Sequence, residues 1–216
     1  MWWPFLAGAA IGYLLGAIPT GLLVGRLARG IDIRQYGSGK TGFTNVLRTV
    51  GPRWGAVALV GDLAKGAVPV VIARLLSDEP YVQTVAGLAA AVGHDWPVFA
   101  GFRGGRGVAA SFGAALGMNP IAAAALIPVG VGLVAVTRIM SVMTVGMAPV
   151  LAAVFIALAA AGIHPWAYAV YSIVAAAMVI AIHRENIARL LAGTEPRLGQ
   201  GGEQREEAPR PDAPSQ

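Results

Sequence analysis

The chain has 216 residues, of which 56% are hydrophobic and 12% are charged, and its formal net charge is +5. Soluble domains carry about 25% charged residues, so this composition predicts a protein embedded in a lipid bilayer and excludes an ordinary soluble domain. Most of the 16 basic residues lie in short segments between or after the apolar runs, a pattern that sets membrane topology and speaks against nucleic-acid binding. The sequence has no cysteine, which excludes disulfides, thiolate metal sites and an acyl-cysteine intermediate.

Seven apolar runs predict membrane-spanning helices, because a helix needs about 20 mostly apolar residues to cross a bilayer. In chain order the runs cover residues 3–24, 54–76, 82–101, 107–118, 120–136, 140–163 and 165–182. The fourth is short for a full crossing, so we expect a half-helix joined to the fifth run at Asn119–Pro120, and a five-span count stays open. The predicted fold class is all-α, a polytopic integral membrane helical bundle of about seven transmembrane helices.

The first run is expected to be kept as a span. It begins directly with apolar residues, without the basic segment and the small-residue cleavage site of a secretory signal peptide. The whole chain divides into a transmembrane domain, residues 1–195, and a polar tail, residues 196–216. The tail is rich in Pro, Gly, Glu, Gln and Arg, and this composition predicts disorder.

The positions of the basic residues predict the orientation of the bundle. They gather in the segments after the first and third runs, at Arg26, Arg29, Arg34, Lys40, Arg48, Arg53, Arg103 and Arg106. Loops enriched in Lys and Arg face the cytoplasm, whereas the acidic turn at residues 77–80 is expected on the other side. With an odd number of spans, the N-terminus is predicted outside and the C-terminus in the cytoplasm.

The first loop has the composition of a phosphate-binding segment. Glycines let backbone N–H groups converge on an anion, hydroxyls and an amide add donors, and an arginine binds phosphate through two parallel hydrogen bonds. The candidate residues here are Gly37, Ser38, Gly39, Gly42, Thr44, Asn45 and Arg48. The sequence Gly39–Lys40–Thr41 is not a P-loop, because Arg34 stands where that motif needs glycine and a membrane span precedes it. A flexible loop that only carries orienting charge is the alternative.

The segment at residues 93–107 is a second group of cations among glycines. Two arginines flank a turn that exposes backbone donors, and Gly107 opens the next helix, whose N-terminus favours an anion. The candidates are His94, Arg103, Gly104, Gly105, Arg106 and Gly107. A lone histidine at a span end is more often an interfacial residue than a catalytic one. His94–Asp95 also lacks the His-x-x-x-x-Asp spacing of the thioester-dependent glycerolipid acyltransferases, and this disfavours that class.

A third polar group follows the last apolar run. If residues 183–195 are helical, His183 and Asn186 share a face, and Glu185 can pair with Arg189 four residues on. A basic helix end that anchors the chain to the membrane is the alternative.

Ionisable residues inside or beside the spans are further candidates. Asp62 and Lys65 lie three residues apart in the second run, where charges usually face the bundle interior. Direct substrate contact by Lys65 and mutual neutralisation of the two charges are equally compatible with the spacing. Ser141 lies at a predicted cytoplasmic boundary beside Arg138, where interfacial anchoring is the simpler interpretation.

Taken together, these groups resemble the acyl-phosphate-dependent glycerol-3-phosphate acyltransferases, the PlsY family. The resemblance rests on Gly37–Gly39 with Gly42, Thr44, Asn45 and Arg48, on Gly93–His94 with Pro97, Phe99 and Gly104–Val108, and on His183–Ile187. It extends to about Glu195 and takes in residues 62–66 and Ser141. The chain departs from the family at Lys40, where Asn is usual, at Phe43, where Ala is common, and at Arg103 and Arg106, where Lys is common. Both arginines keep the charge, although their geometry differs from that of lysine.

The resemblance implies transfer of a fatty acyl group from acyl phosphate to the 1-hydroxyl of sn-glycerol 3-phosphate, the first step of bacterial phospholipid biosynthesis. The products would be lysophosphatidic acid and inorganic phosphate. The implied location is the bacterial inner membrane, with the active site at the cytoplasmic face. No cofactor and no metal are expected. The expected partners are the two substrates and the lipid bilayer; a monomeric state and contact with the enzyme that makes the acyl phosphate both remain open.

Within this hypothesis the catalytic candidates are His183, Asn186, Ser38 and Arg48. Ser38, Thr44, Asn45 and Arg48 are assigned to one phosphate, residues 103–106 to anion binding, and His183 with Asn186 to the acceptor; Lys65 and Ser141 are added as substrate-binding candidates. The acceptor hydroxyl needs to lose a proton, and the sequence leaves open whether His183, His94 or a phosphate oxygen of the donor takes it.

Two other functions compete. A transporter of a small organic phosphate would also use intramembrane charge and small-residue helices, but the polar groups lie on one face rather than at the midplane of the bilayer. A phosphotransferase that makes lipid head groups would need an Asp-rich metal-binding helix, and no predicted span holds more than Asp62.

Overall fold

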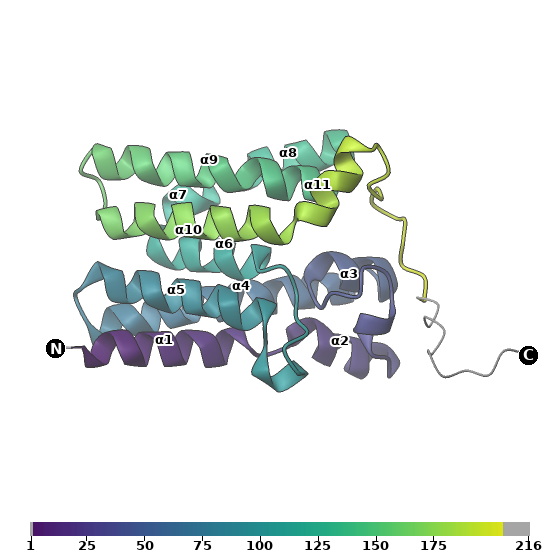
Figure 1. Ribbon diagram of the computed structural model, residues 1–216, viewed down its shortest axis with the longest axis horizontal. Helices are drawn as coiled ribbons and strands as arrows, with labels where there is room; N and C mark the ends of the chain where they lie inside the picture. Colours follow the sequence, from purple (N-terminus) through teal and green to yellow (C-terminus); the bar gives the residue numbers. More distant parts are fainter. Residues whose placement is uncertain (1, 205–216) are drawn as a thin grey trace, which may run out of the picture.

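The computed structural model describes residues 2–204, and within this range the chain is a bundle of helices without β-strands (Figure 1). The α-helices are α1 (Trp3–Gly16), α2 (Thr20–Arg29), α3 (Phe43–Thr49), α4 (Pro52–Leu76), α5 (Pro80–Asp95), α6 (Val108–Met118), α7 (Pro120–Ala124), α8 (Ile127–Thr137), α9 (Met140–Ala160), α10 (Trp166–Ile182) and α11 (Arg184–Leu191). Two short 3₁₀ helices, η1 (Ile33–Gln35) and η2 (Val98–Ala100), lie in the loops. The predicted all-α class is confirmed.

Four helical segments of the described chain are long and apolar enough to cross a membrane: Trp3–Arg29, Pro52–Leu76, Pro120–Thr137 and Met140–Ala160. α10 and α11 give a fifth if their 61° bend is counted within one span. α5 has 16 residues and α6 has 11, so both are shorter than the usual length of a span. The predicted count of seven spans therefore stays a prediction.

Prolines explain where helices end earlier than the apolar runs do. The third run was expected to reach residue 101, but α5 ends at Asp95. Trp96 precedes Pro97, which disfavours the helical region for Trp96, and its φ and ψ are −126° and 67°. The first run is likewise broken, because α1 ends at Gly16 and α2 starts only after Pro19. The break after α5 begins the loop that carries Arg106, whereas the break before Thr20 is followed by α2 and only then by the first polar loop.

Glycines let the helices of the bundle approach closely. A Cβ atom on Gly66 of α4 would lie 1.9 Å from the carbonyl oxygen of Ala110 in α6, and one on Gly113 of α6 would lie 2.1 Å from the carbonyl oxygen of Leu63. Such distances are impossible for a real side chain, so only glycine allows this backbone contact. The contact brings the beginning of α6 close to the middle of α4.

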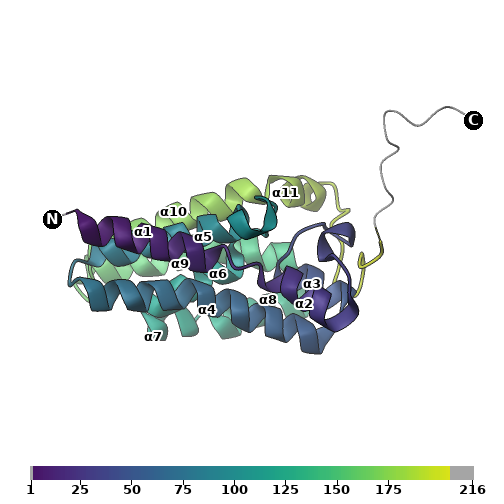
Figure 2. The ribbon, with the colours of Figure 1, turned by 90° about the horizontal axis from the view of Figure 1, so that it is seen from below.

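The polar segments gather at one end of the bundle. α2, α3 and α11 lie together at this end, and the N-terminus lies at the opposite end (Figures 1 and 2). The turn between α4 and α5, which holds Asp78 and Glu79, lies near the N-terminal end (Figure 1). The basic and acidic segments thus occupy opposite ends, as the predicted orientation requires; the side of the membrane that each end faces stays a prediction.

Candidate active site

A cavity of about 960 Å³ lies at the polar end of the bundle and extends between the helices. Many predicted site residues line it: Gly37, Ser38, Gly42, Thr44, Asn45, Arg48, His94, Arg106, Ser141, His183 and Asn186. The others, which do not line it, are Gly39, Lys65, Arg103, Gly104, Gly105 and Gly107. The structure therefore brings side chains from three distant polar segments around one space.

Asn45, at the start of α3, organises the first loop. Its side chain is buried, and its Oδ1 accepts a hydrogen bond from the backbone N–H of Ser38 at 3.1 Å. Its Nδ2 donates to the carbonyl oxygens of Ile33, Tyr36 and Lys40 at 3.0, 3.1 and 2.9 Å. Gly37 has a positive φ of 52°, and a Cβ atom there would lie 2.3 Å from Asn45 Oδ1. The Asn45 amide thus binds the loop itself, and the loop leaves Ser38 and Thr44 in the cavity wall.

Arg48 lines the cavity and has a hydrogen-bond donor without a partner in the described part of the chain. Its Nη2 donates to the carbonyl oxygen of Pro196 at 3.1 Å, but its Nε is buried without a hydrogen-bond partner among the described residues. Burial lowers the pKa of the Arg48 guanidinium, while the nearby Glu195 carboxylate raises it. A buried donor without a partner is costly, so an anion in the cavity would stabilise it.

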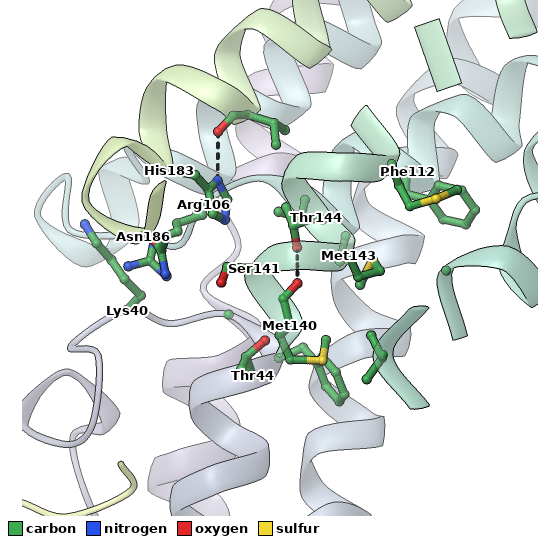
Figure 3. A pocket seen from close by; sticks show the side chains of 18 of the residues that line it. Lys40, Thr44, Arg106, Phe112, Met140, Ser141, Met143, Thr144, His183 and Asn186 are labelled. Atoms are coloured by element: carbon green, nitrogen blue, oxygen red, sulfur yellow. Dashed lines mark hydrogen bonds between the residues drawn. The ribbon is translucent and has the colours of Figure 1, made fainter. Parts of the chain in front are cut away.

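Arg106 enters the cavity from the loop between α5 and α6. Gly107 follows it in the left-handed region, with φ of 64°. Figure 3 shows the Arg106 side chain beside His183 and Asn186. Burial lowers the pKa of the Arg106 guanidinium, and the charge of Arg189 lowers it further. A partly desolvated cation attracts an anion more strongly than one in water does. Arg103, in contrast, is exposed.

His183 stands at the bend between α10 and α11 and lines the cavity together with Asn186. His183 Nδ1 lies 2.7 Å from the carbonyl oxygen of Val179, an interaction drawn as a dashed line in Figure 3. A carbonyl only accepts, so this contact assigns the ring proton to Nδ1 in the neutral imidazole. In this tautomer Nε2 keeps a lone pair and can accept a proton.

Glu195 is a site residue that the sequence analysis did not select. Its carboxylate accepts hydrogen bonds from Ser141 Oγ at 2.8 Å, Asn186 Nδ2 at 2.6 Å and Arg189 Nε at 2.7 Å. Burial raises the pKa of Glu195, but the hydrogen bonds from these three side chains outweigh it and hold the pKa below its usual value. The carboxylate ties α9 to α11 and orients two predicted site residues.

The partner of Arg189 differs from the one expected. The spacing within a helix predicted a pair with Glu185, but Arg189 forms its ion pair with Glu195 at 2.7 Å. The chain reverses at Gly193, where φ is 69°, and this returns Glu195 to the side of α11. In the sequence, the glycine at position 193 was the one local signal for this reversal, because a glycine after a helix often adopts the left-handed conformation.

Lys65 lies outside the cavity wall, in the bundle interior. Its Nζ is 2.9 Å from Asp62 Oδ1 and donates to the carbonyl oxygen of Ile18 at 2.8 Å. Of the two interpretations left open, this geometry matches the mutual neutralisation of Asp62 and Lys65. A role of Lys65 in substrate binding stays a prediction.

The other part of the cavity is apolar. Leu126, just before α8, and residues from α6, α8 and α9 line it: Phe112, Ile127, Val131, Val134, Met143, Met147 and Leu151. Figure 3 shows Phe112 and Met143 on the side of the cavity opposite Lys40, Arg106 and Asn186. A ligand with an anionic head and a long apolar tail fits such a two-part space.

The residues after Glu195 run back across the first loop. We call residues 196–204 the C-terminal strap. Its Leu198 N–H donates to the Arg138 carbonyl oxygen at 2.7 Å, and its Glu203 carbonyl oxygen accepts from the Gly37 N–H at 2.8 Å. Residues 205–216 lie outside the described residues, so the disorder predicted for the tail stays a prediction there.

Within residues 2–204, no group of three His, Cys, Asp or Glu side chains is placed to hold a metal ion. The independence of the reaction from metals and cofactors stays a prediction.

Sequence comparisons point to one family. The model of the family "Glycerol-3-phosphate acyltransferase" matches residues 6–193. A glycerol-3-phosphate acyltransferase from Synechococcus sp. (strain CC9902) is 44% identical over 193 residues, which cover 89% of this chain and 94% of the relative. One from Geobacter sulfurreducens is 45% identical over 191 residues, covering 88% of this chain and 95% of the relative.

Solved structures agree. A crystal structure of PlsY (YgiH), an integral membrane glycerol 3-phosphate acyltransferase, in its glycerol 3-phosphate form, superposes with a TM-score of 0.81 and 36% sequence identity, covering 90% of this chain and 96% of that chain. The lysophosphatidic acid form of PlsY gives a TM-score of 0.80, also at 36% identity, with 89% and 94% covered.

Proposed function

The chain belongs to the glycerol-3-phosphate acyltransferase family and is an integral membrane acyltransferase, and we propose that its acyl donor is acyl phosphate. The fatty acyl group goes to the 1-hydroxyl of sn-glycerol 3-phosphate, and the products are lysophosphatidic acid and inorganic phosphate. The reaction takes place at the cytoplasmic face of the bacterial inner membrane.

The two-part cavity is the observation that carries this proposal. Acyl phosphate joins a phosphate to a chain that prefers lipid, and glycerol 3-phosphate brings a second phosphate. Arg48 and Arg106 supply cations at the polar end, and Arg48 adds a buried Nε without a hydrogen-bond partner among the described residues. The apolar walls of α8 and α9 continue from this end. One connected space thus suits both substrates. A transporter, the alternative function, finds no support in the comparisons, which are with acyltransferases.

The chemistry requires positioning, charge stabilisation and removal of one proton. The acceptor hydroxyl oxygen attacks the carbonyl carbon of the mixed anhydride, the new ester bond forms, and the bond to the phosphate oxygen breaks. Arg106 and Arg48 stabilise the phosphate that leaves. His183 takes the hydroxyl proton on Nε2, because its Nδ1 proton is held by Val179. This favours His183 over His94 as the base.

The purified protein in detergent tests the proposal. It is given acyl phosphate and labelled glycerol 3-phosphate in the presence of a chelator, and we expect labelled lysophosphatidic acid and one inorganic phosphate for each ester formed. The same mixture with an acyl thioester in place of acyl phosphate serves as the control and should give no product. Product from the thioester alone would contradict the assignment of the donor.

A further inference from the structure

A buried polar cluster joins α2, α4 and α5 at the cavity, whose wall includes Asp62 and His94. Asp62 of α4 is fully buried, and its Oδ1 accepts a hydrogen bond from Thr20 Oγ1. The same oxygen lies 2.9 Å from Lys65 Nζ and 3.4 Å from His94 Nδ1. Since an isolated buried carboxylate costs several kcal/mol, this one depends on its neighbours and holds them in turn. The cluster fixes where three helices meet.

The cluster also uses the break between α1 and α2. The carbonyl oxygen of Ile18, which lies in the break between the two helices, accepts hydrogen bonds from the Thr20 N–H at 3.0 Å and from Lys65 Nζ at 2.8 Å. Lys65 therefore binds the carboxylate and the broken helix at once. His94 lies between Asp62 and the loop that carries Arg106.

The His94 ring is packed between Asp62 and that loop. Its Nδ1 faces Asp62, while a Cβ atom on Gly105 would lie only 1.9 Å from its Nε2. The backbone N–H of Gly105 also donates to the carbonyl oxygen of His94 at 3.1 Å. A Cβ atom on Gly104 would lie 2.1 Å from the same carbonyl oxygen. The loop thus lies directly on His94, so a movement of the ring toward Gly105 would displace the loop.

We propose that Asp62 is a positioning residue for acyl transfer: through the His94 ring and the backbone of Gly105 it fixes the place of Arg106 in the cavity. Asp62 touches no reacting atom in this role. The inference rests on the proposed function, which assigns Arg106 to the phosphate that leaves. It explains why a charged residue is kept at the centre of a membrane-spanning helix, where charge is costly.

A double-mutant cycle of Asp62→Asn and Arg106→Ala tests the proposal. Two residues that act through one interaction give losses that do not multiply. We expect Asp62→Asn to lower kcat/KM by about 10-fold or more in the wild type and by less than about 3-fold in the Arg106→Ala background. Losses that multiply would overturn the proposal, because they would assign Asp62 a structural role independent of Arg106.

Thr84→Val is the matched control. Thr84 is a buried residue of α5, the helix that carries His94, and its hydroxyl donates to the carbonyl oxygen of Ala167 at 2.8 Å. Its replacement removes a buried hydrogen bond far from the loop in sequence. Any loss that it causes should be the same in the presence and absence of Arg106.

Two further measurements keep the test decisive. If Asp62→Asn does not fold, Thr20→Val removes one donor from the same carboxylate, and its loss of kcat/KM should likewise vanish in the Arg106→Ala background; persistence of that loss would overturn the proposal. The dissociation constant for inorganic phosphate does not depend on turnover. Asp62→Asn should raise this dissociation constant when Arg106 is present and leave it unchanged in the Arg106→Ala background. A wild type that binds phosphate but transfers no acyl group would reject the proposed function alone.

Discussion

Arg106 and Arg103 are two cations of one loop with different surroundings. Arg106 lines the cavity, whereas Arg103 is exposed and lies outside its wall. Charge-assisted hydrogen bonds contribute about 1.5–3 kcal/mol, so Arg106→Ala should lower kcat/KM by about 10- to 100-fold. Steady-state kinetics with each substrate varied in turn measure the loss. Arg103→Ala, the matched control, should change kcat/KM by less than about 3-fold; equal losses for the two variants would contradict the assignment.

Glu195 is the residue for which a pH-dependent stability is expected. Its folded-state pKa lies below the unfolded value of about 4.3. The carboxylate therefore stabilises the fold fully above that value, and the contribution is lost as pH falls through the folded-state pKa. We expect Glu195→Gln to lower the unfolding midpoint at pH 7 and the difference from wild type to shrink below pH 4. Thermal unfolding in detergent measures both. A difference that stays constant between pH 7 and pH 3 would speak against this role.

At the scale of the elements, the contact of α4 with α6 depends on glycine. Gly113→Val places a side chain where the carbonyl oxygen of Leu63 lies, so the helices have to separate. Overpacking of this kind costs about 1–3 kcal/mol, and we expect a lower unfolding midpoint together with lower activity, because α6 begins directly after the Arg106 loop. Gly132→Val in α8 is the control, since nothing lies within 4 Å of a Cβ atom there. Equal unfolding midpoints for the two variants would contradict the packing argument.

The sequence predicted helices well where the bilayer dictates their composition, and less well where single residues end them. The runs at 54–76 and 140–163 agree closely with α4 and α9 because a long apolar helix needs no other signal. Pro97 is the signal for the early end of α5 at Asp95. The last apolar run ends at residue 182, where α10 ends, but nothing in the sequence predicts the 61° angle between α10 and α11.

The candidate site was predictable only where its chemistry is local. Glycines and cations within one loop identified the region of Ser38 and that of Arg106. The contacts of Asp62 with His94 and of Ser141 with Glu195 join residues that are distant in the chain, and only the packing of the helices brings them together. The spacing of four residues within a helix therefore predicted Glu185 as the partner of Arg189, whereas Glu195 lies beyond the helix and was not predicted.

At the scale of the whole molecule, the C-terminal strap covers the loop that the N-terminal half contributes to the cavity. The Glu203 carbonyl oxygen accepts a hydrogen bond from the Gly37 N–H at 2.8 Å, and that of Gly202 accepts one from Thr49 Oγ1 at 3.5 Å. Pro196 and Leu198 also contribute to the cavity wall. The match to the family model ends at residue 193, so the strap lies beyond that match.

Deletion of residues 199–216 removes both bonds to Gly37 and Thr49 but keeps Glu195 and Pro196. Hydrogen bonds of this kind contribute about 0.5–1.5 kcal/mol each, so a looser first loop should raise KM for a phosphate-bearing substrate by about 3- to 10-fold. We expect kcat to change less, because within the described chain no hydrogen bond joins His183 or Arg106 to residues 199–204. Deletion of residues 205–216 keeps the described hydrogen bonds of the strap and is the control. If the two deletions give the same KM, the strap has no part in ordering the loop; a rise confined to the longer deletion assigns it that role.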